Sequence, residues 1–115
     1  MDEDLLEVRI ASVDNWFLVT VHGEIDASTV ITFRAALEQV PASDTVVVNL
    51  ANVRFLDSSG LGVLATQTRR LCEGGGSLEV LHASAAVRRV VEVAGLGALI
   101  ETSDVLTSTI DYGRV

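Results

Sequence analysis

The sequence alternates between two hydrophobic periods, and this alternation constrains the fold more than any other feature. Near the start of the chain, apolar residues recur at every second position over residues 6–10 and again over 17–21, which predicts two strands. Asp14 and Asn15 lie between these segments and favour a tight turn. We therefore expect a hairpin of two antiparallel strands.

From residue 28 onward, helical and strand periods follow one another. Val30, Phe33 and Leu37 share one face of a predicted helix, and the β-branched residues over 46–50 predict a strand that is covered on both faces. Ser84 is typical of a helix N-cap. The other expected elements are a helix over 61–71, a strand over 78–81, a helix over 84–94 that ends at Gly95, a short strand over 98–100 and a helix that begins at Ser103.

This order of elements predicts an α/β fold. Strands that alternate with helices are expected to be parallel and joined by helical crossovers, whereas the first hairpin adds one antiparallel pair. We expect a mixed sheet of about 4–5 strands with about four helices. A chain of 115 residues fits a single domain over 1–115, with a core over about 5–110.

The charge of the chain limits its partners. Sixteen acidic residues stand against eight basic ones, all of them arginine, so the net charge is −8. Nucleic-acid binding depends on basic groups that neutralise phosphates, and anionic membranes repel an acidic surface. We therefore expect no direct nucleic-acid binding and no membrane binding, and a charged protein partner is expected to present a basic face.

Cys72 is the single cysteine, so no internal disulfide is expected and a reducing compartment is favoured. The acidic first residues do not resemble a secretory signal, and no apolar run approaches the roughly 18 residues that a membrane span needs. We expect a cytoplasmic protein. His22, His82 and Cys72 lack the close spacing of metal ligands, so a structural role is predicted for each and neither metal nor cofactor is expected.

The segment over 55–62 is the most informative one for function. It lies where a buried strand turns into a helix, at the edge of the sheet where α/β folds place their sites. Asp57 or Ser58 can cap the helix. Gly60 and Gly62 lack side chains, so another molecule can approach the backbone closely. The segment fits a plain helix start, but free N–H groups at this position also suit a phosphate on Ser58.

Two further acids, Glu24 and Asp26, leave three alternatives open. They can form a carboxylate pair, since residues two apart share a face in an extended segment. They can instead be solvated acids, with Asp26 capping the first helix, or they can border a partner-binding face beside Ser58. An enzyme is not expected, because Asp57 stands where a Gly-x-Ser-x-Gly nucleophile elbow needs its first glycine.

The segment Asp57-Ser58-Ser59-Gly60-Leu61-Gly62 resembles the signature of the STAS family, specifically its stand-alone anti-sigma factor antagonists. Three other segments match in the same order along the chain. They are Gly23-Glu24-Ile25-Asp26, the glycines before Leu78-Glu79-Val80, and Val93-Ala94-Gly95-Leu96. The resemblance covers about residues 5–110.

The resemblance implies a partner switch. The unphosphorylated antagonist binds an anti-sigma factor that is itself a serine kinase, and a sigma factor is released. Phosphorylation of Ser58 ends the binding, and a phosphatase resets Ser58. Whether Ser59 is a second acceptor stays open. The residues implied to bind the partner are Glu24, Asp26, Asp57, Ser58, Ser59, Gly60, Leu61 and Gly62.

One alternative interpretation retains the fold but assigns a different function to the chain. The same fold serves several roles, so the chain could be a non-phosphorylated STAS interaction module of a transporter or of a larger signalling complex. The presence of the acceptor serine in a free-standing chain favours the antagonist.

Overall fold

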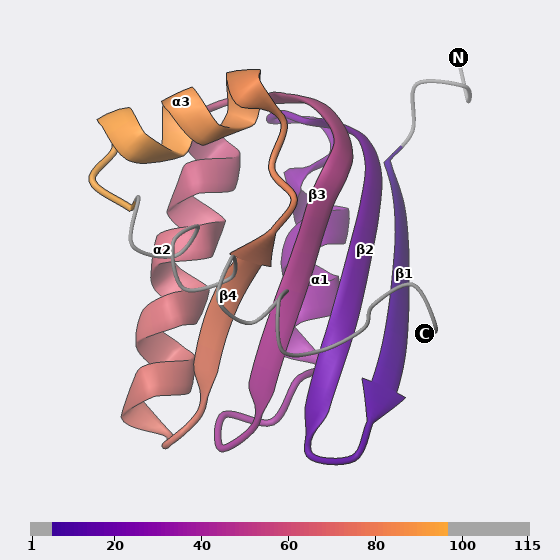
Figure 1. Ribbon diagram of the computed structural model, residues 1–115, viewed down its shortest axis with the longest axis vertical. Coiled ribbons are helices and arrows are strands. Elements are labelled where there is room, and N and C mark those ends of the chain that lie inside the picture. The colour runs from indigo at the N-terminus through magenta and orange to yellow at the C-terminus, as the bar shows by residue number, and fades with distance from the viewer. Residues whose placement is uncertain (1–5, 97–115) are drawn as a thin grey trace.

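A four-stranded sheet forms the centre of the structure, a computed structural model that describes residues 6–96 (Figure 1). Its strands lie in the order β1-β2-β3-β4. They are β1 (Glu7–Val13), β2 (Trp16–Ile25), β3 (Thr45–Leu56) and β4 (Ser77–Leu81). β1 pairs with β2 in antiparallel fashion, whereas β2 with β3 and β3 with β4 are parallel. The predicted hairpin and the mixed sheet are both confirmed.

The described helices are α1 (Val30–Glu38), α2 (Ser58–Glu73) and α3 (Ala85–Val93). α1 and α2 lie side by side on one face of the sheet, and α3 crosses the edge where β3 ends (Figure 1). The predicted strand over 98–100 and the predicted helix that begins at Ser103 lie outside the described residues. The α/β architecture is confirmed.

The core lies between the sheet and the two helices that cover it. Alternate residues of β3 point to this side, including Val46, Val48 and Leu50, all of which are fully buried. Phe33 and Leu37 of α1 pack against them from the helical layer. Val47 faces the other side of the sheet and is also fully buried, which confirms that this strand is covered on both faces.

β3 is longer than its hydrophobic pattern predicts. The pattern indicates a strand that ends at Leu50, but the strand continues to Leu56. Beyond Leu50 only Val53 and Leu56 are buried, so the pattern loses its period of two. Pairing with β2 maintains the extension, through a register that shifts twice before Ile25. This pairing cannot be read from the local sequence.

The predicted N-caps of the second and third helices agree with the structure, whereas α2 extends beyond the expected residues 61–71 at both ends. Asp57 precedes α2, and Ser84 caps α3 by accepting a hydrogen bond from the Val87 N–H at 3.3 Å. Gly95 follows α3 with a φ of 83°, a left-handed conformation that favours glycine. Helix positions were predictable because capping depends on residues that are close in sequence.

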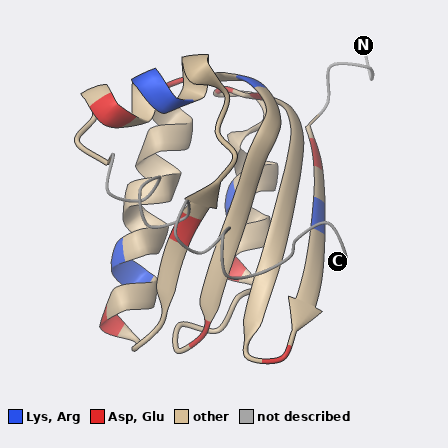
Figure 2. Cartoon of the chain, viewed as in Figure 1, with Lys and Arg blue, Asp and Glu red and all other residues tan. Residues whose placement is uncertain are grey.

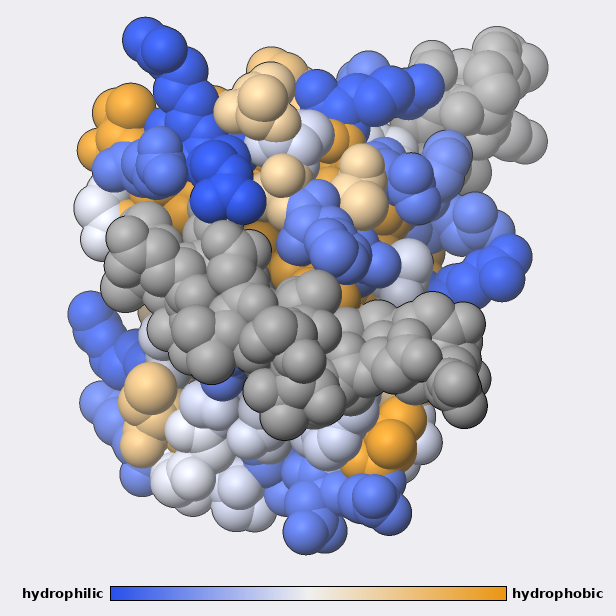
Figure 3. Space-filling view, viewed as in Figure 1, coloured by the Kyte–Doolittle hydropathy of each residue, from blue (hydrophilic) through white to orange (hydrophobic). Residues whose placement is uncertain are grey.

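The charged residues lie on the helices, at the strand ends and on the outer strands β1 and β4, whereas the middle of β2 and β3 is free of charge (Figure 2). On the part of this face that is not drawn in grey, hydrophilic atoms gather at both ends of the strands and apolar patches are small (Figure 3). No helix within residues 6–96 is long and apolar enough to cross a membrane.

Arg70 of α2 connects the two helices on the covered face of the sheet. Its guanidinium Nη2 donates to the carbonyl oxygens of Leu37 at 3.0 Å and Val40 at 2.9 Å, at the end of α1. Its Nε donates to Gln67 Oε1 at 2.8 Å, and Gln67 is itself buried. Arg70 thereby supplies a charged donor to carbonyl groups where α1 ends, and the Leu37 carbonyl also accepts from the Val40 N–H at 3.1 Å.

We expect Arg70→Ala to lower the free energy of unfolding by about 1–3 kcal/mol, because the substitution removes a charged donor from these carbonyls. The neighbouring Arg69 is exposed, so Arg69→Ala is the matched control and should change stability by less than about 0.5 kcal/mol. Urea denaturation followed by circular dichroism measures both values. Equal effects of the two substitutions would contradict the role of Arg70.

Candidate functional site

Two parallel strands end side by side and bring two helix starts together. Ile25 of β2 is in register with Leu56 of β3, and the Asp57 N–H donates to the Ile25 carbonyl at 3.2 Å. Asp26 and Asp57 follow these strand ends and precede α1 and α2. The segment over 55–62 therefore lies at a strand-to-helix junction on the carboxyl edge of the sheet, as its sequence predicts.

Asp57, rather than Ser58, caps α2. Its Oδ1 accepts from the Ser59 N–H at 2.9 Å, and the Ser59 hydroxyl donates to the same oxygen. The hydrogen bond from the Ser59 hydroxyl is the main cause that holds the pKa of Asp57 below its usual range, while the charge of Asp26 opposes this shift. Asp57 is thus a fixed, ionised carboxylate directly before Ser58.

Ser58 is the first residue of α2, and its side chain is exposed. Its hydroxyl makes no hydrogen bond with any residue in the described part of the chain. Ser59 differs, because it is half-buried and its hydroxyl is committed to Asp57. Of the two serines, Ser58 is therefore the one whose oxygen another molecule can reach.

The two glycines of this segment serve different purposes. Gly60 is buried, and a Cβ at this position would overlap the Leu56 side chain and come within 2.7 Å of Ile25 Cγ2. Its missing side chain is explained by packing against the strand ends, and not by the approach of another molecule. Gly62 is exposed, and a Cβ there would meet nothing within 4 Å. Leu61 is half-buried and packs against the core.

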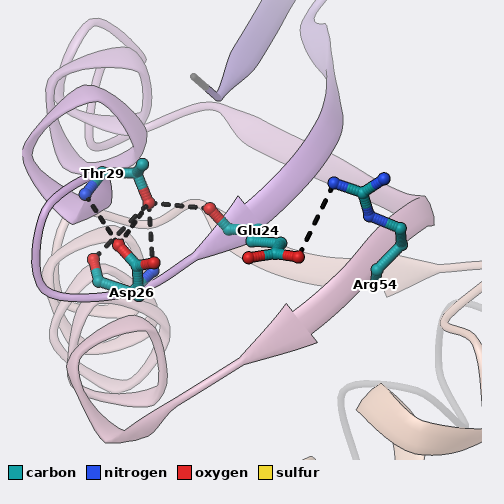
Figure 4. Close-up of polar contacts among 4 residues, drawn as sticks. All are labelled: Glu24, Asp26, Thr29 and Arg54. Carbon is teal, nitrogen blue, oxygen red and sulfur yellow. Dashed lines mark hydrogen bonds and ion pairs between the residues drawn. The ribbon is translucent and has the colours of Figure 1, made fainter. Parts of the chain in front are cut away.

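Glu24 and Asp26 do not form a carboxylate pair. The Glu24 carboxylate points to Arg54 of β3, with Glu24 Oε2 at 3.6 Å from Arg54 Nη2 (Figure 4). The Asp26 carboxylate turns instead toward the start of α1 (Figure 4). Asp26 Oδ1 accepts from the N–H groups of Ser28 at 2.9 Å and Thr29 at 3.1 Å, in the turn that leads into α1. The Ser28 hydroxyl also donates to it, and this bond is the main cause of the lowered pKa of Asp26. The N-cap of α1 is Thr29, so the prediction that Asp26 caps this helix is wrong.

Three residues of this edge have no counterpart in the predicted site. Thr29 is buried, and its hydroxyl donates to the Glu24 carbonyl at 2.7 Å and accepts from the Asp26 N–H at 3.0 Å. Arg54 pairs with Glu24, and Arg34 of α1 lines a hollow together with Ser58. Thr29 lies close to Asp26 in sequence and could have been found as a capping residue. The two arginines depend on contacts between separate elements.

No group of three or more His, Cys, Asp and Glu side chains within residues 6–96 could hold a metal ion. His22, His82 and Cys72 are all exposed. Cys72 lies in α2 one residue before its end.

Comparisons with known proteins agree on one family. A family model described as "Mlab, STAS domain" matches residues 8–101. The anti-sigma-B factor antagonist of Staphylococcus epidermidis is 31% identical over 101 residues, which span 86% of this chain and 94% of that protein. The chain therefore belongs to the STAS-domain family.

Solved structures of anti-sigma factor antagonists share the fold. One from Mycobacterium paratuberculosis has a TM-score of 0.74 and 32% identity, and covers 83% of this chain and 82% of its own. SpoIIAA in its phosphorylated form, from Bacillus, has a TM-score of 0.65 and 25% identity, with 81% and 87% covered. The similarity in sequence and that in structure thus lead to the same class of regulator.

The two glycines permit a matched test of the packing. We expect Gly60→Ala to lower the free energy of unfolding by about 1–3 kcal/mol, because the added methyl group overpacks the strand ends. Gly62→Ala should raise it by about 0.5–1 kcal/mol, because alanine is the better helix former and the position is open. Thermal and urea unfolding measure both. Stabilisation by Gly60→Ala would contradict the packing described here.

The hydrogen-bonded carboxylates of Asp57 and Asp26 predict a pH dependence of stability. A carboxylate whose pKa is lowered by folding adds stability above its unfolded pKa, and that stability is lost as the pH falls through the folded pKa. The free energy of unfolding should therefore decrease as the pH falls below about 4, with Asp57 and Asp26 contributing. Asp57→Asn should make this decrease shallower in urea titrations at a series of pH values. An unchanged slope would show that Asp57 does not contribute.

Proposed function

We propose that this protein is an anti-sigma factor antagonist whose activity is switched by phosphorylation of Ser58. The observation that carries the proposal is the exposed Ser58 hydroxyl, which makes no hydrogen bond within the described residues and stands directly after the fixed Asp57 carboxylate. A kinase needs an acceptor oxygen that it can reach. The relatives named anti-sigma factor antagonists, one of them solved in a phosphorylated form, support the same role.

In the proposed mechanism, the unphosphorylated protein binds an anti-sigma factor that is a serine kinase, and the sigma factor is released. The kinase transfers the γ-phosphoryl group of ATP to Ser58 Oγ, so that a phosphate ester forms, ADP leaves and the hydroxyl proton is lost. The complex then separates, and a phosphatase hydrolyses the ester. The protein acts as a binding partner in the cytoplasm, without a cofactor and without enzymatic activity of its own.

The proposed partner-binding surface surrounds Ser58. Ser59 and Gly62 continue it along α2, and Leu61 and the buried Gly60 support it from beneath. Glu24, Asp26 and Asp57 make its border acidic, so a basic partner face suits it. A phosphate adds about −1.5 to −2 charges to this acidic border, which opposes binding both by its bulk and by its charge.

The proposal predicts that Ser58→Ala still binds the kinase but cannot be phosphorylated. Ser58→Asp should weaken binding about tenfold or more, because it places a charge on a surface that docks without one. Incubation with the cognate kinase and ATP, followed by mass spectrometry, locates the modified residue. Isothermal titration calorimetry with the same kinase compares the affinities.

Ser59→Ala is the matched control, since it removes a hydroxyl one residue away and leaves Ser58 in place. It should still be phosphorylated. Phosphate found only at other residues would contradict the proposal. Affinity capture that recovers transporter or other signalling components, and no kinase, would instead favour the non-phosphorylated STAS interaction module.

A further inference from the structure

A hollow of about 370 Å³ lies on the surface where α1 and α2 run side by side. Arg34 and Glu38 of α1 line it on one side, and Ser58, Ser59, Gly62 and Thr66 of α2 on the other. The hollow is far larger than the space that a single water needs, so it can accept a group that projects from Ser58. The proposed acceptor residue therefore borders a space that already exists.

Arg34 is the cation of this hollow. Because β2 and β3 end at the same edge, α1 and α2 both start there. Ser58 is the first residue of α2, and Arg34 lies in the second turn of α1. Helical side chains lean toward the N-terminus of their helix, which directs Arg34 toward the edge that carries Ser58. Arg34 is exposed and makes no hydrogen bond or ion pair with any of the residues 6–96.

The negative charges around Ser58 disfavour a phosphate there unless a cation lies nearby. Asp57 precedes Ser58, and Asp26 is close enough to influence the titration of Asp57, so a phosphate here meets two carboxylates. Arg54, on the same edge, already pairs with Glu24 at 3.6 Å. Glu38 lies one helical turn beyond Arg34, farther from the edge, and forms no ion pair with it. Arg34 is therefore the cation in this hollow that can balance the charge of a phosphate on Ser58.

We propose that Arg34 binds the phosphate of phosphorylated Ser58 within the same molecule and holds it in the hollow between α1 and α2. The planar guanidinium can donate two parallel hydrogen bonds to phosphate oxygens, which a lysine cannot do. This inference rests on the proposed function and adds a regulatory step to it. The phosphorylated protein fills its own hollow, so the surface beside Gly62 is occupied before any partner arrives.

The test uses the full chain with phosphoserine incorporated at position 58 during translation, so that it does not depend on a kinase. Phosphorus NMR titration then gives the second pKa of the phosphate, which is about 6 for free phosphoserine. Arg34→Gln should raise this pKa by roughly half a unit, because the nearby cation that favours the dianion is lost. Arg34→Lys, which keeps the charge without the fork, should give an intermediate value.

Arg69→Gln is the matched control, since it removes an exposed arginine that does not line the hollow and should leave the phosphate pKa unchanged. As a second readout, phosphorylation should raise the melting temperature of the unsubstituted protein by more than it raises the melting temperature of Arg34→Gln. Equal phosphate pKa values in the unsubstituted protein and Arg34→Gln would overturn the inference. A kinase that fails to modify Ser58 would contradict the proposed function instead, so the two failures are distinguishable.

Discussion

The parallel pairing of β2 with β3 is the interaction on which the candidate site depends. It places Ile25 beside Leu56, and the helices that follow the two strands therefore start at the same edge of the sheet. Each strand end is followed by an aspartate: Asp57 caps α2, and Asp26 accepts from N–H groups in the turn that leads into α1. If this register were shifted, Asp57 would no longer stand near Asp26, and the two helices would not enclose a common hollow. The chemistry of the edge is thus a product of sheet topology.

The sequence predicts most of the described elements because the signals are local. Periods of two and 3.6, the turn at Asp14 and the cap at Ser84 all involve residues that are close along the chain. The end of β3 was not predictable, since its last residues alternate irregularly and are maintained by a neighbouring strand. Which of Asp57 and Ser58 caps α2 was not predictable either, because the two residues are adjacent and both carry a side-chain oxygen that can accept from the first turn.

The candidate site was predictable only in part, for the same reason. Ser58 stands at a strand-to-helix junction that local patterns reveal. Gly60 was expected to admit another molecule, whereas it packs against Ile25 and Leu56, one of which is far away in sequence. Arg34 and Arg54 gain their meaning only from elements that fold beside them. The patterns of one sequence give no direct information on contacts between elements that are far apart along the chain.

The packing of Gly60 limits how far a change at the start of α2 can alter the structure around it. With no gap beneath it, the first turn of α2 has little freedom to shift, since close-packed interiors resist small displacements. We therefore expect a modification of Ser58 to alter the electric field and the outline of the surface without rearranging the backbone. The electrostatic part of this effect is screened by salt, so the distance over which it acts is set by the ionic strength of the medium.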